Sequence, residues 1–265
     1  MLEKKIISVQ NFQYKEWKKL HQKKYRNQKR KYFIEGIKML EEAIKWNNSF
    51  EAILYSSKLF DVNGGKELYQ KLLKIDIPIF ELKHTLFKEL CFTENSQGIM
   101  AVLKQPSYFL KDVLDEDFSS IIVLENIQDP GNLGTIIRTA DAAGFNAVFL
   151  SKGCVDLYND KTLRATMGSF FHLPIVQGVE LERFICDLIE KEYQVVGSSL
   201  HTDYYYHKVE YSKKKALIIG NESHGISQAV EKLCTNLVKV PILGHAESLN
   251  AAIAAGILMY KMQGV

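Results

Sequence analysis

Short apolar segments alternate along the chain with longer segments in which apolar residues recur every three or four positions. The first pattern predicts β-strands and the second predicts amphipathic helices. In the first hundred residues, strands are predicted at 32–36, 52–55, 77–80 and 98–103, and helices at 37–46, 66–73 and 84–90. Strands that alternate with helices in this way indicate an α/β layer structure.

A second alternating series begins after the polar residues 104–107 and the acidic stretch 112–117. Its predicted strands are 121–124, 147–150, 193–197, 216–219 and 237–240, with helices between them and a last helix from about 248 to 262. Residues 121–124 are all apolar, as expected of a strand at the centre of a parallel sheet. The pattern therefore predicts two α/β units, with a boundary near 104–107.

The composition is that of a globular protein, with 46% hydrophobic and 25% charged residues. The apolar run 251–260 is much shorter than the roughly 20 residues that cross a bilayer, and the first residues lead into no apolar signal segment. Cys91, Cys154, Cys186 and Cys234 form no C-x-x-C pair and have no His at metal-binding spacing. We therefore expect a cytoplasmic protein with reduced thiols, no bound metal and no membrane contact.

Positive charge is concentrated at the start of the chain. Residues 1–31 contain eleven Lys and Arg and two Glu, a local net charge of +9 in a chain whose total is +3. Such a segment attracts a polyanion, and Tyr14, Trp17 and Tyr25 lie between the charges, where they could stack on bases. We predict that residues 1–30 form a basic helix that binds RNA through Lys23, Lys24, Arg26, Lys29 and Arg30. The alternative is an amphipathic helix whose apolar residues merely pack.

Three polar loops follow three of the predicted strands of the second unit, where ligands of open α/β sheets bind. The first loop spans 125–134 and opens a helix that carries Arg138; Pro130-Gly131 predicts a turn, and Asn132 suits a helix cap. Gly131-x-x-Gly134 also matches the RNA-clamping loop of KH domains, but that loop joins two helices. The phosphate-loop and dinucleotide-binding motifs are absent from the sequence.

The second and third loops each allow two interpretations. In 220–225, Ser223 could be the nucleophile of a hydrolase elbow, or Gly220 could admit a ligand while Glu222 anchors neighbouring loops. In 240–250, Ser248 could cap the following helix or serve catalysis together with Asn250. Each motif by itself is a weak signal.

Taken together, the three loops resemble the SpoU (TrmH) branch of the SPOUT RNA methyltransferases. Asn132-x-Gly134-x-x-x-Arg138 resembles the first family motif, Gly220-Asn221-Glu222 with Gly225 the second, and Pro241 through Ser248-Leu249-Asn250-Ala251 the third. The stretch 158–169 is also similar to the family, and residues 30–103 resemble the ribosomal-protein-like domain that often precedes the catalytic one. The sequence departs from the family pattern at Ser223-His224.

The resemblance implies a fold and a cofactor. It implies an α/β SPOUT domain over 118–265, with a parallel sheet and a deep trefoil knot, preceded by a small α/β RNA substrate-binding domain over 31–104. S-adenosylmethionine would bind in the knot loops, mainly through backbone groups, at Gly220, Val240, Ile242 and Leu249. It also implies a homodimer with RNA lying across both subunits.

The activity implied is methyl transfer to a ribose 2′-hydroxyl of RNA. Ribosomal RNA is favoured over transfer RNA because the extra N-terminal domain resembles that of rRNA-directed members. Because a guanidinium stays protonated, Arg138 would bind a phosphate and stabilise alkoxide charge rather than act as a base. Asn132, Ser248 and Asn250 would position Arg138 and the ribose, and Glu222 would orient backbone or Asn132. A non-catalytic RNA-binding protein would have no need of this intact set.

Overall fold

A computed structural model describes residues 4–116 and 118–265 and divides the chain into two compact units, with the division between Ser107 and Tyr108. The first three residues of the basic segment and Asp117, the last residue of the acidic stretch, lie outside the described residues. Among the described residues, no helix is long and apolar enough to cross a membrane. Both units are α/β, which confirms the predicted fold class.

The first unit is built on one mixed sheet of five strands in the order β1-β4-β3-β5-β2. Strands β1 and β3 run parallel to β4, whereas β5 runs antiparallel to β3 and β2. Its elements, in chain order, are β1 Lys4–Ile6, α1 Phe12–Lys19, α2 Lys23–Lys29, β2 Lys31–Glu35, α3 Ile37–Lys45, β3 Phe50–Tyr55, η1 Ser57–Asp61, α4 Gly65–Leu72, β4 Ile79–Leu82, α5 His84–Leu90 and β5 Ile99–Lys104.

The prediction of one basic helix over residues 1–30 is wrong. The described part of this segment forms an edge strand, β1, and two short helices, α1 and α2. Tyr14 and Trp17 are 1% and 4% exposed and pack into the hydrophobic core of the first unit, with Trp17 edge-on to Phe80. These two rings are therefore core residues and cannot stack on bases. For them the alternative interpretation is correct, in which the apolar residues of this segment only pack.

Arg26 also departs from its predicted role as a phosphate contact. Its side chain is buried, and Nη1 donates hydrogen bonds of 2.8 Å to the backbone oxygens of Leu20 and His21. Residues 20–22 separate α1 from α2, so the guanidinium ties the turn between these two helices together. Arg26 is a structural residue, and we remove it from the predicted RNA contacts.

The second unit contains six strands, all parallel, in the order β11-β9-β10-β6-β7-β8. Its elements are α6 Leu110–Asp115, β6 Ser120–Leu124, α7 Pro130–Ala142, β7 Ala147–Ser151, α8 Asp160–Ala165, η2 Ser169–Phe171, β8 Ile175–Val179, α9 Leu181–Glu190, β9 Gln194–Ser198, η3 Tyr206–Lys208, β10 Lys215–Ile219, α10 Gln228–Leu233, β11 Asn236–Val238 and α11 Ala251–Met262. Strand β6, which is apolar from Ile121 to Leu124, lies in the interior of this sheet, as its sequence predicts.

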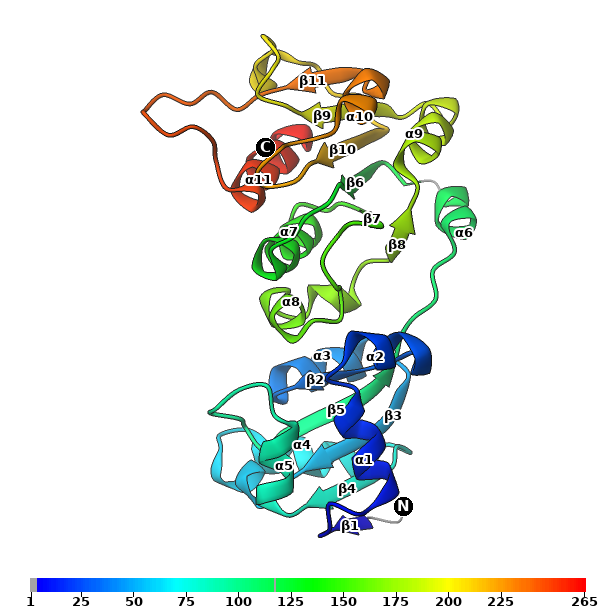
Figure 1. The fold of residues 1–265 in the computed structure, drawn as a ribbon, viewed down its shortest axis with the longest axis vertical. Helices are drawn as coiled ribbons and strands as arrows, with labels where there is room; N and C mark the ends of the chain where they lie inside the picture. Colours follow the sequence, from blue (N-terminus) through cyan, green and yellow to red (C-terminus); the bar gives the residue numbers. More distant parts are fainter. Residues whose placement is uncertain (1–3, 117) are drawn as a thin grey trace. The chain divides into compact units, whose positions relative to one another are not determined.

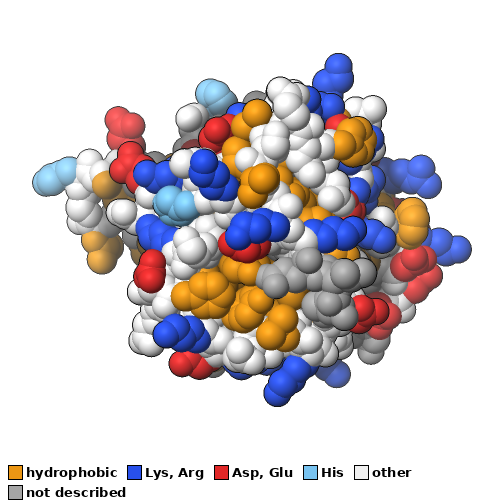
Figure 2. Space-filling model, turned by 90° about the horizontal axis from the view of Figure 1, so that it is seen from below, with side chains coloured by type: hydrophobic (Ala, Val, Ile, Leu, Met, Phe, Trp, Pro, Cys, Tyr) orange, Lys and Arg blue, Asp and Glu red, His pale blue; other side chains and the backbone are white. Residues whose placement is uncertain are grey.

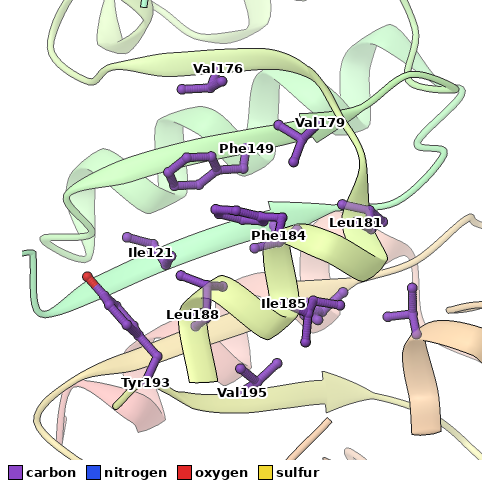
Figure 3. Close-up of a cluster of buried hydrophobic side chains, with 14 of the residues drawn as sticks. Ile121, Phe149, Val176, Val179, Leu181, Phe184, Ile185, Leu188, Tyr193 and Val195 are labelled. Atoms are coloured by element: carbon purple, nitrogen blue, oxygen red, sulfur yellow. The ribbon is translucent and has the colours of Figure 1, made fainter. Parts of the chain in front are cut away.

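Helices cover both faces of this parallel sheet (Figure 1). On one face, α9 and α10 pack on alternate strand residues, and Figure 3 shows Phe184 of α9 lying against Phe149 of β7, with ring centroids 4.5 Å apart. On the other face lie α7 and α11, which pack against each other, and α11 also contacts β10. The three-layer packing fixes the carboxyl ends of β6 and β10, from which the motif loops emerge.

Candidate active site

The first two motif loops leave the sheet side by side. Strands β6 and β10 are parallel neighbours, with Leu124 paired with Ile219, so residues 125–129 and 220–227 begin at the same sheet edge. The third loop extends from Lys239 to Asn250 and then enters α11, which packs on α7 (Figure 1). Segments about a hundred residues apart in the sequence therefore meet at one place.

Glu222 joins the second loop to the first. Its Oε1 accepts hydrogen bonds from the backbone N–H of Asp129 and from Asn132 Nδ2, both at 3.0 Å. Its Oε2 accepts from the backbone N–H of Gln128 at 3.1 Å. Burial raises the pKa of Glu222, but these donors outweigh it and hold the pKa below its ordinary value. The carboxylate is therefore an anchor with both oxygens engaged.

Asn132 extends this contact to the third loop. Its Oδ1 accepts a hydrogen bond of 2.8 Å from Asn250 Nδ2, so Glu222, Asn132 and Asn250 form a chain of hydrogen bonds across all three loops. We call these three residues the loop network. The structure also places two helix caps at residues other than the predicted ones. Asp129, not Asn132, caps α7, and Asn250, not Ser248, caps α11 by accepting from the backbone N–H of Ala252.

A second carboxylate links the same two loops in the opposite direction. Glu125 directly follows β6, its side chain is 7% exposed, and its Oε2 accepts a hydrogen bond of 2.8 Å from the backbone N–H of Ser227. Glu222 thus fixes the first loop from the second, while Glu125 fixes the end of the second loop from the first. Sequence reasoning missed Glu125, although a charged residue directly after a wholly apolar strand was a usable signal.

Two motif glycines are required by close backbone approach. A Cβ on Gly220 would lie 2.1 Å from the backbone carbon of Gly225, because Asn221 and Gly225 exchange backbone hydrogen bonds of 2.9 Å in a tight turn. A Cβ on Gly134 would lie 2.5 Å from Ala165 Cβ, where α7 packs against α8. The space that a side chain on Gly220 would need is therefore filled by the turn itself, whereas the backbone of Gly220 stays open to the cleft described next.

The loops enclose a cleft that contains all four predicted cofactor residues, Gly220, Val240, Ile242 and Leu249. We call it the main cleft. A second hollow adjoins it and is lined by Asn132, Glu222, Ser248 and Asn250, which are four of the five predicted catalytic residues. The two share six lining residues: Asn221, Glu222, Ser223, Ser248, Leu249 and Ala251. Two adjoining hollows of this kind are suited to hold two different molecules in contact.

Arg138, the fifth predicted catalytic residue, is not brought to these pockets. It lies on α7 six residues after Asn132 and is exposed to solvent. Within residues 4–116 and 118–265, its guanidinium makes no hydrogen bond or ion pair, and it lines neither the main cleft nor the adjoining hollow. The predicted positioning of Arg138 by Asn132, Ser248 and Asn250 therefore has no contact in this chain that supports it.

Ser223 lacks the partners of a hydrolase nucleophile. Its backbone N–H donates 2.9 Å to Asn221 Oδ1, which fixes the turn, and its hydroxyl has no imidazole partner among the described residues. The neighbouring His224 is likewise held through its backbone N–H by Asn221. The hydrolase hypothesis is dropped. The KH alternative also fails, because Gly131 and Gly134 lie inside α7 rather than in a loop between helices.

The cysteines form no site of their own, although the thiol of Cys154 donates 3.3 Å to the carbonyl of Leu124, where the first motif loop begins. None forms a disulfide, and burial raises the pKa of Cys91 to about 11 and that of Cys234 to about 12, so these thiols are protonated at neutral pH. Over the described part of the chain, no group of three or more His, Cys, Asp or Glu is placed to hold a metal ion.

Comparison with known proteins defines the class to which this fold and site belong. Residues 119–260 match the SpoU rRNA methylase family, and residues 11–101 match the MRM3-like substrate binding domain. The chain belongs to the SpoU rRNA methylase family, which confirms the resemblance seen in the three motifs.

Individual relatives align over almost the whole chain. The 23S rRNA (guanosine(2553)-2′-O)-methyltransferase RlmP of Bacillus subtilis is 38% identical over 98% of this chain and 100% of its own length. The AdoMet-bound rRNA methyltransferase from Sinorhizobium meliloti has a TM-score of 0.87 at 30% identity and covers 99% of this chain and 98% of its own. The SpoU methyltransferase AviRb from Streptomyces viridochromogenes, in complex with AdoMet, has a TM-score of 0.87 at 25% identity, over 96% of this chain and 98% of its own.

Proposed function

We propose that this protein transfers a methyl group from S-adenosylmethionine to a ribose 2′-hydroxyl of ribosomal RNA. The observation that carries the proposal is the pair of joined pockets. The four predicted cofactor residues line the main cleft, and four predicted catalytic residues line the hollow beside it. The membership in the SpoU family and the activity of the RlmP relative support this assignment.

The residues of the main cleft fit S-adenosylmethionine. Ile219, Val240, Ile242 and Leu249 offer an apolar slot for the adenine ring, and the backbone at Gly220 and Gly225 borders it. Glu231 and Lys239 line the same cleft and supply charges of both signs for the amino acid end of the cofactor. When bound, the cofactor supplies an electrophilic methyl group.

The loop network would hold the ribose in place. Because both oxygens of Glu222 accept hydrogen bonds and its pKa is lowered, Glu222 is a positioning residue rather than a proton acceptor. Asn132 and Asn250 present their amides to the hollow, and Ser248 lines it with a hydroxyl. These groups can orient a 2′-hydroxyl towards the main cleft, and alignment of this kind lowers the barrier to transfer.

Arg138 keeps its proposed role in binding a phosphate and stabilising alkoxide charge, with the RNA supplying the phosphate. Its exposure, and its lack of a partner among the residues that the structure describes, leave the guanidinium free for this contact. In the first unit, Lys23, Lys24, Lys29 and Arg30 are exposed and are proposed to contact RNA phosphates. The view in Figure 2 shows Lys and Arg interspersed with acidic side chains around a group of hydrophobic ones, so charge is not gathered into one patch on that face.

The proposal includes a homodimer. Helix α11 is apolar on more than one face: Ala255, Leu258 and Met259 are buried within the unit, yet Ile253 and Tyr260 are 55% and 41% exposed. A second copy covering these residues would remove apolar surface from water. Gly256 of α11 faces Thr139, so Arg138 lies close to the helix proposed as the interface. Sedimentation as a monomer at micromolar concentration, with full activity, would contradict this part.

Mapping of 2′-O-methylation in cellular RNA, with and without the gene, tests the function. We expect a single ribose in 23S rRNA to lose its methyl group, as the activity of the relative suggests. Purified protein with S-adenosylmethionine should restore it on an unmethylated 23S transcript. Loss of a methyl group from a transfer RNA instead would favour the alternative substrate, and no change in any RNA would refute the proposal.

A further inference from the structure

The connection between β9 and β10 is unusual for two neighbouring parallel strands. Such strands are commonly joined through an α-helix, whereas residues 199–214 contain only the short helix η3. This connection carries three consecutive tyrosines, Tyr204 to Tyr206, followed by His207 and Lys208. Neither the loop network nor the main cleft explains these aromatic residues.

This segment is attached to the wall of the main cleft. The backbone N–H of Lys239 donates 2.9 Å to the carbonyl of Tyr204, and the backbone N–H of Tyr206 donates 3.0 Å to the carbonyl of Lys239. Lys239 lines the main cleft, as do Leu200 and His201 at the start of the same connection. Tyr204 is therefore held by backbone contacts at the cleft margin but does not itself line the cleft.

The side chains of this segment combine exposed aromatic rings with positive charge. Tyr204 is 69% exposed, so its ring contributes little to the core. The ring of Tyr205 lies nearly parallel to that of His207, with centroids 5.8 Å apart, and the Nζ of Lys208 lies 5.7 Å from the Tyr205 centroid. The Nζ of Lys239 forms an ion pair with Asp203 Oδ1 at 3.9 Å. Lys208, in contrast, has no carboxylate partner within the described residues.

We propose that Tyr204 and Lys208 form an RNA-contact surface beside the main cleft, where an unpaired base next to the target nucleotide stacks on Tyr204 and its phosphate contacts Lys208. This rests on the proposed function. Exposed aromatic rings flanked by cations are the usual means of holding single-stranded RNA, because every base has a face that can stack. A ribose that must enter the hollow brings unpaired neighbours with it.

The test measures methylation kinetics on an unmethylated 23S rRNA transcript. Tyr204→Ala should raise the KM for RNA at least about fivefold, since loss of one base stack has an effect of that order. The kcat at saturating RNA should stay within about twofold, and calorimetry should give an unchanged Kd for S-adenosylmethionine. Tyr204→Phe keeps the ring and should restore the KM. Phe109→Ala is the matched control, because Phe109 in the same unit is 68% exposed.

A charge variant tests the second half of the surface. Lys208→Gln should flatten the plot of log affinity against log salt by about 0.7 to 0.9, the slope of a single phosphate contact. If Tyr204→Ala changes the KM no more than Phe109→Ala does, the stacking surface is refuted. A changed sedimentation coefficient in Tyr204→Ala would refute it too, since the segment would then bind protein. Failure of the proposed function is distinguishable, because the unaltered protein would then methylate no transcript.

Discussion

The loop network of the second unit and the basic segment of the first unit are both polar, yet they are built in opposite ways. In the loop network every side chain has defined partners: Glu222 accepts from three residues, and Asn132 both donates to Glu222 and accepts from Asn250. In the basic segment, Lys23 and Lys24 are exposed and have no hydrogen-bond or ion-pair partner in the described part of the chain, whereas other cations such as Lys18 and Lys19 form exposed ion pairs.

This difference indicates two ways of using polar residues. Groups whose partners are fixed determine geometry, and their removal affects neighbours, so substitutions there should be non-additive. Exposed cations provide charge with little geometry, so their effects should add and should weaken with salt. Arg26 shows that position in the sequence does not decide between the two, because it lies within the basic segment but is buried and hydrogen-bonded.

Arg138 provides the sharpest test of this comparison, because it is exposed like the lysines but belongs to the catalytic unit. If it acts through geometry, Arg138→Lys should lower kcat at least about a hundredfold, or roughly 2.7 kcal/mol, since lysine lacks the planar fork that grips a phosphate and a hydroxyl together. Affinity for S-adenosylmethionine should change less than about tenfold. Single-turnover assays measure the rate of methyl transfer, and calorimetry measures the affinity for S-adenosylmethionine. Near-normal turnover in Arg138→Lys would mean that Arg138 contributes only its positive charge.

The loop network itself can be broken at Glu222. Glu222→Ala leaves the backbone N–H groups of Gln128 and Asp129 without their acceptor, which should lower the free energy of unfolding by about 1–3 kcal/mol. Glu222→Gln keeps one acceptor oxygen, so its free energy of unfolding should fall by less. Urea denaturation measures both. In the double variant Glu222→Ala with Asn132→Ala, the free energy of unfolding should fall by less than the sum of the two single-variant losses, by about 0.5 kcal/mol or more. Strict additivity would mean that the network does not act as one unit.

Regular patterns in the sequence were enough to predict most elements of the fold. The strand predicted at 216–219 is β10, Lys215–Ile219, and the helix predicted at 84–90 is α5, His84–Leu90. The edge strands β2 and β11 were predicted, but the edge strands β1 and β8 were missed because their sequences lack the pattern: β1 has only three residues, and β8 is interrupted by the exposed Gln177 and Gly178. The knot implied by the family resemblance stays a prediction.

The candidate site was predicted as a set of residues but not as an arrangement. Motif spacing identified Asn132, Glu222 and Asn250, but nothing in the sequence says that Asn132 joins the other two, because that depends on strands β6 and β10 being neighbours. Helix caps were misplaced by two or three residues, since Asp129 and Asn132, or Ser248 and Asn250, are equally suited to capping by type.

The basic segment should affect RNA binding mainly through its charge, although Lys29 also pairs with Glu16 at 3.7 Å and Arg30 donates to the carbonyl of Pro106 at 3.2 Å. Replacing Lys23, Lys24, Lys29 and Arg30 with Gln should flatten the salt dependence of RNA binding by about three units, at roughly 0.7 to 0.9 per phosphate contact. Binding of S-adenosylmethionine should not change. Arg26→Gln is the matched control: it should lower the melting temperature, because two backbone acceptors lose their donor, and leave the slope as it was. An unchanged slope in the fourfold variant would remove this segment from the RNA-binding surface.

The smallest effect expected is a pH dependence of stability that originates in the loop network. Hydrogen bonds hold the pKa of Glu222 below its ordinary value of 4.5, so its charged form stabilises the folded state. That contribution is fully present above the pKa of the unfolded chain and is lost as the pH falls through the folded-state pKa. The melting temperature of Glu222→Gln should therefore lie below that of the unaltered protein at pH 7, and the gap should narrow below about pH 4.5. A gap that stays constant down to pH 3 would show that the charge of Glu222 contributes nothing beyond the shape of its side chain.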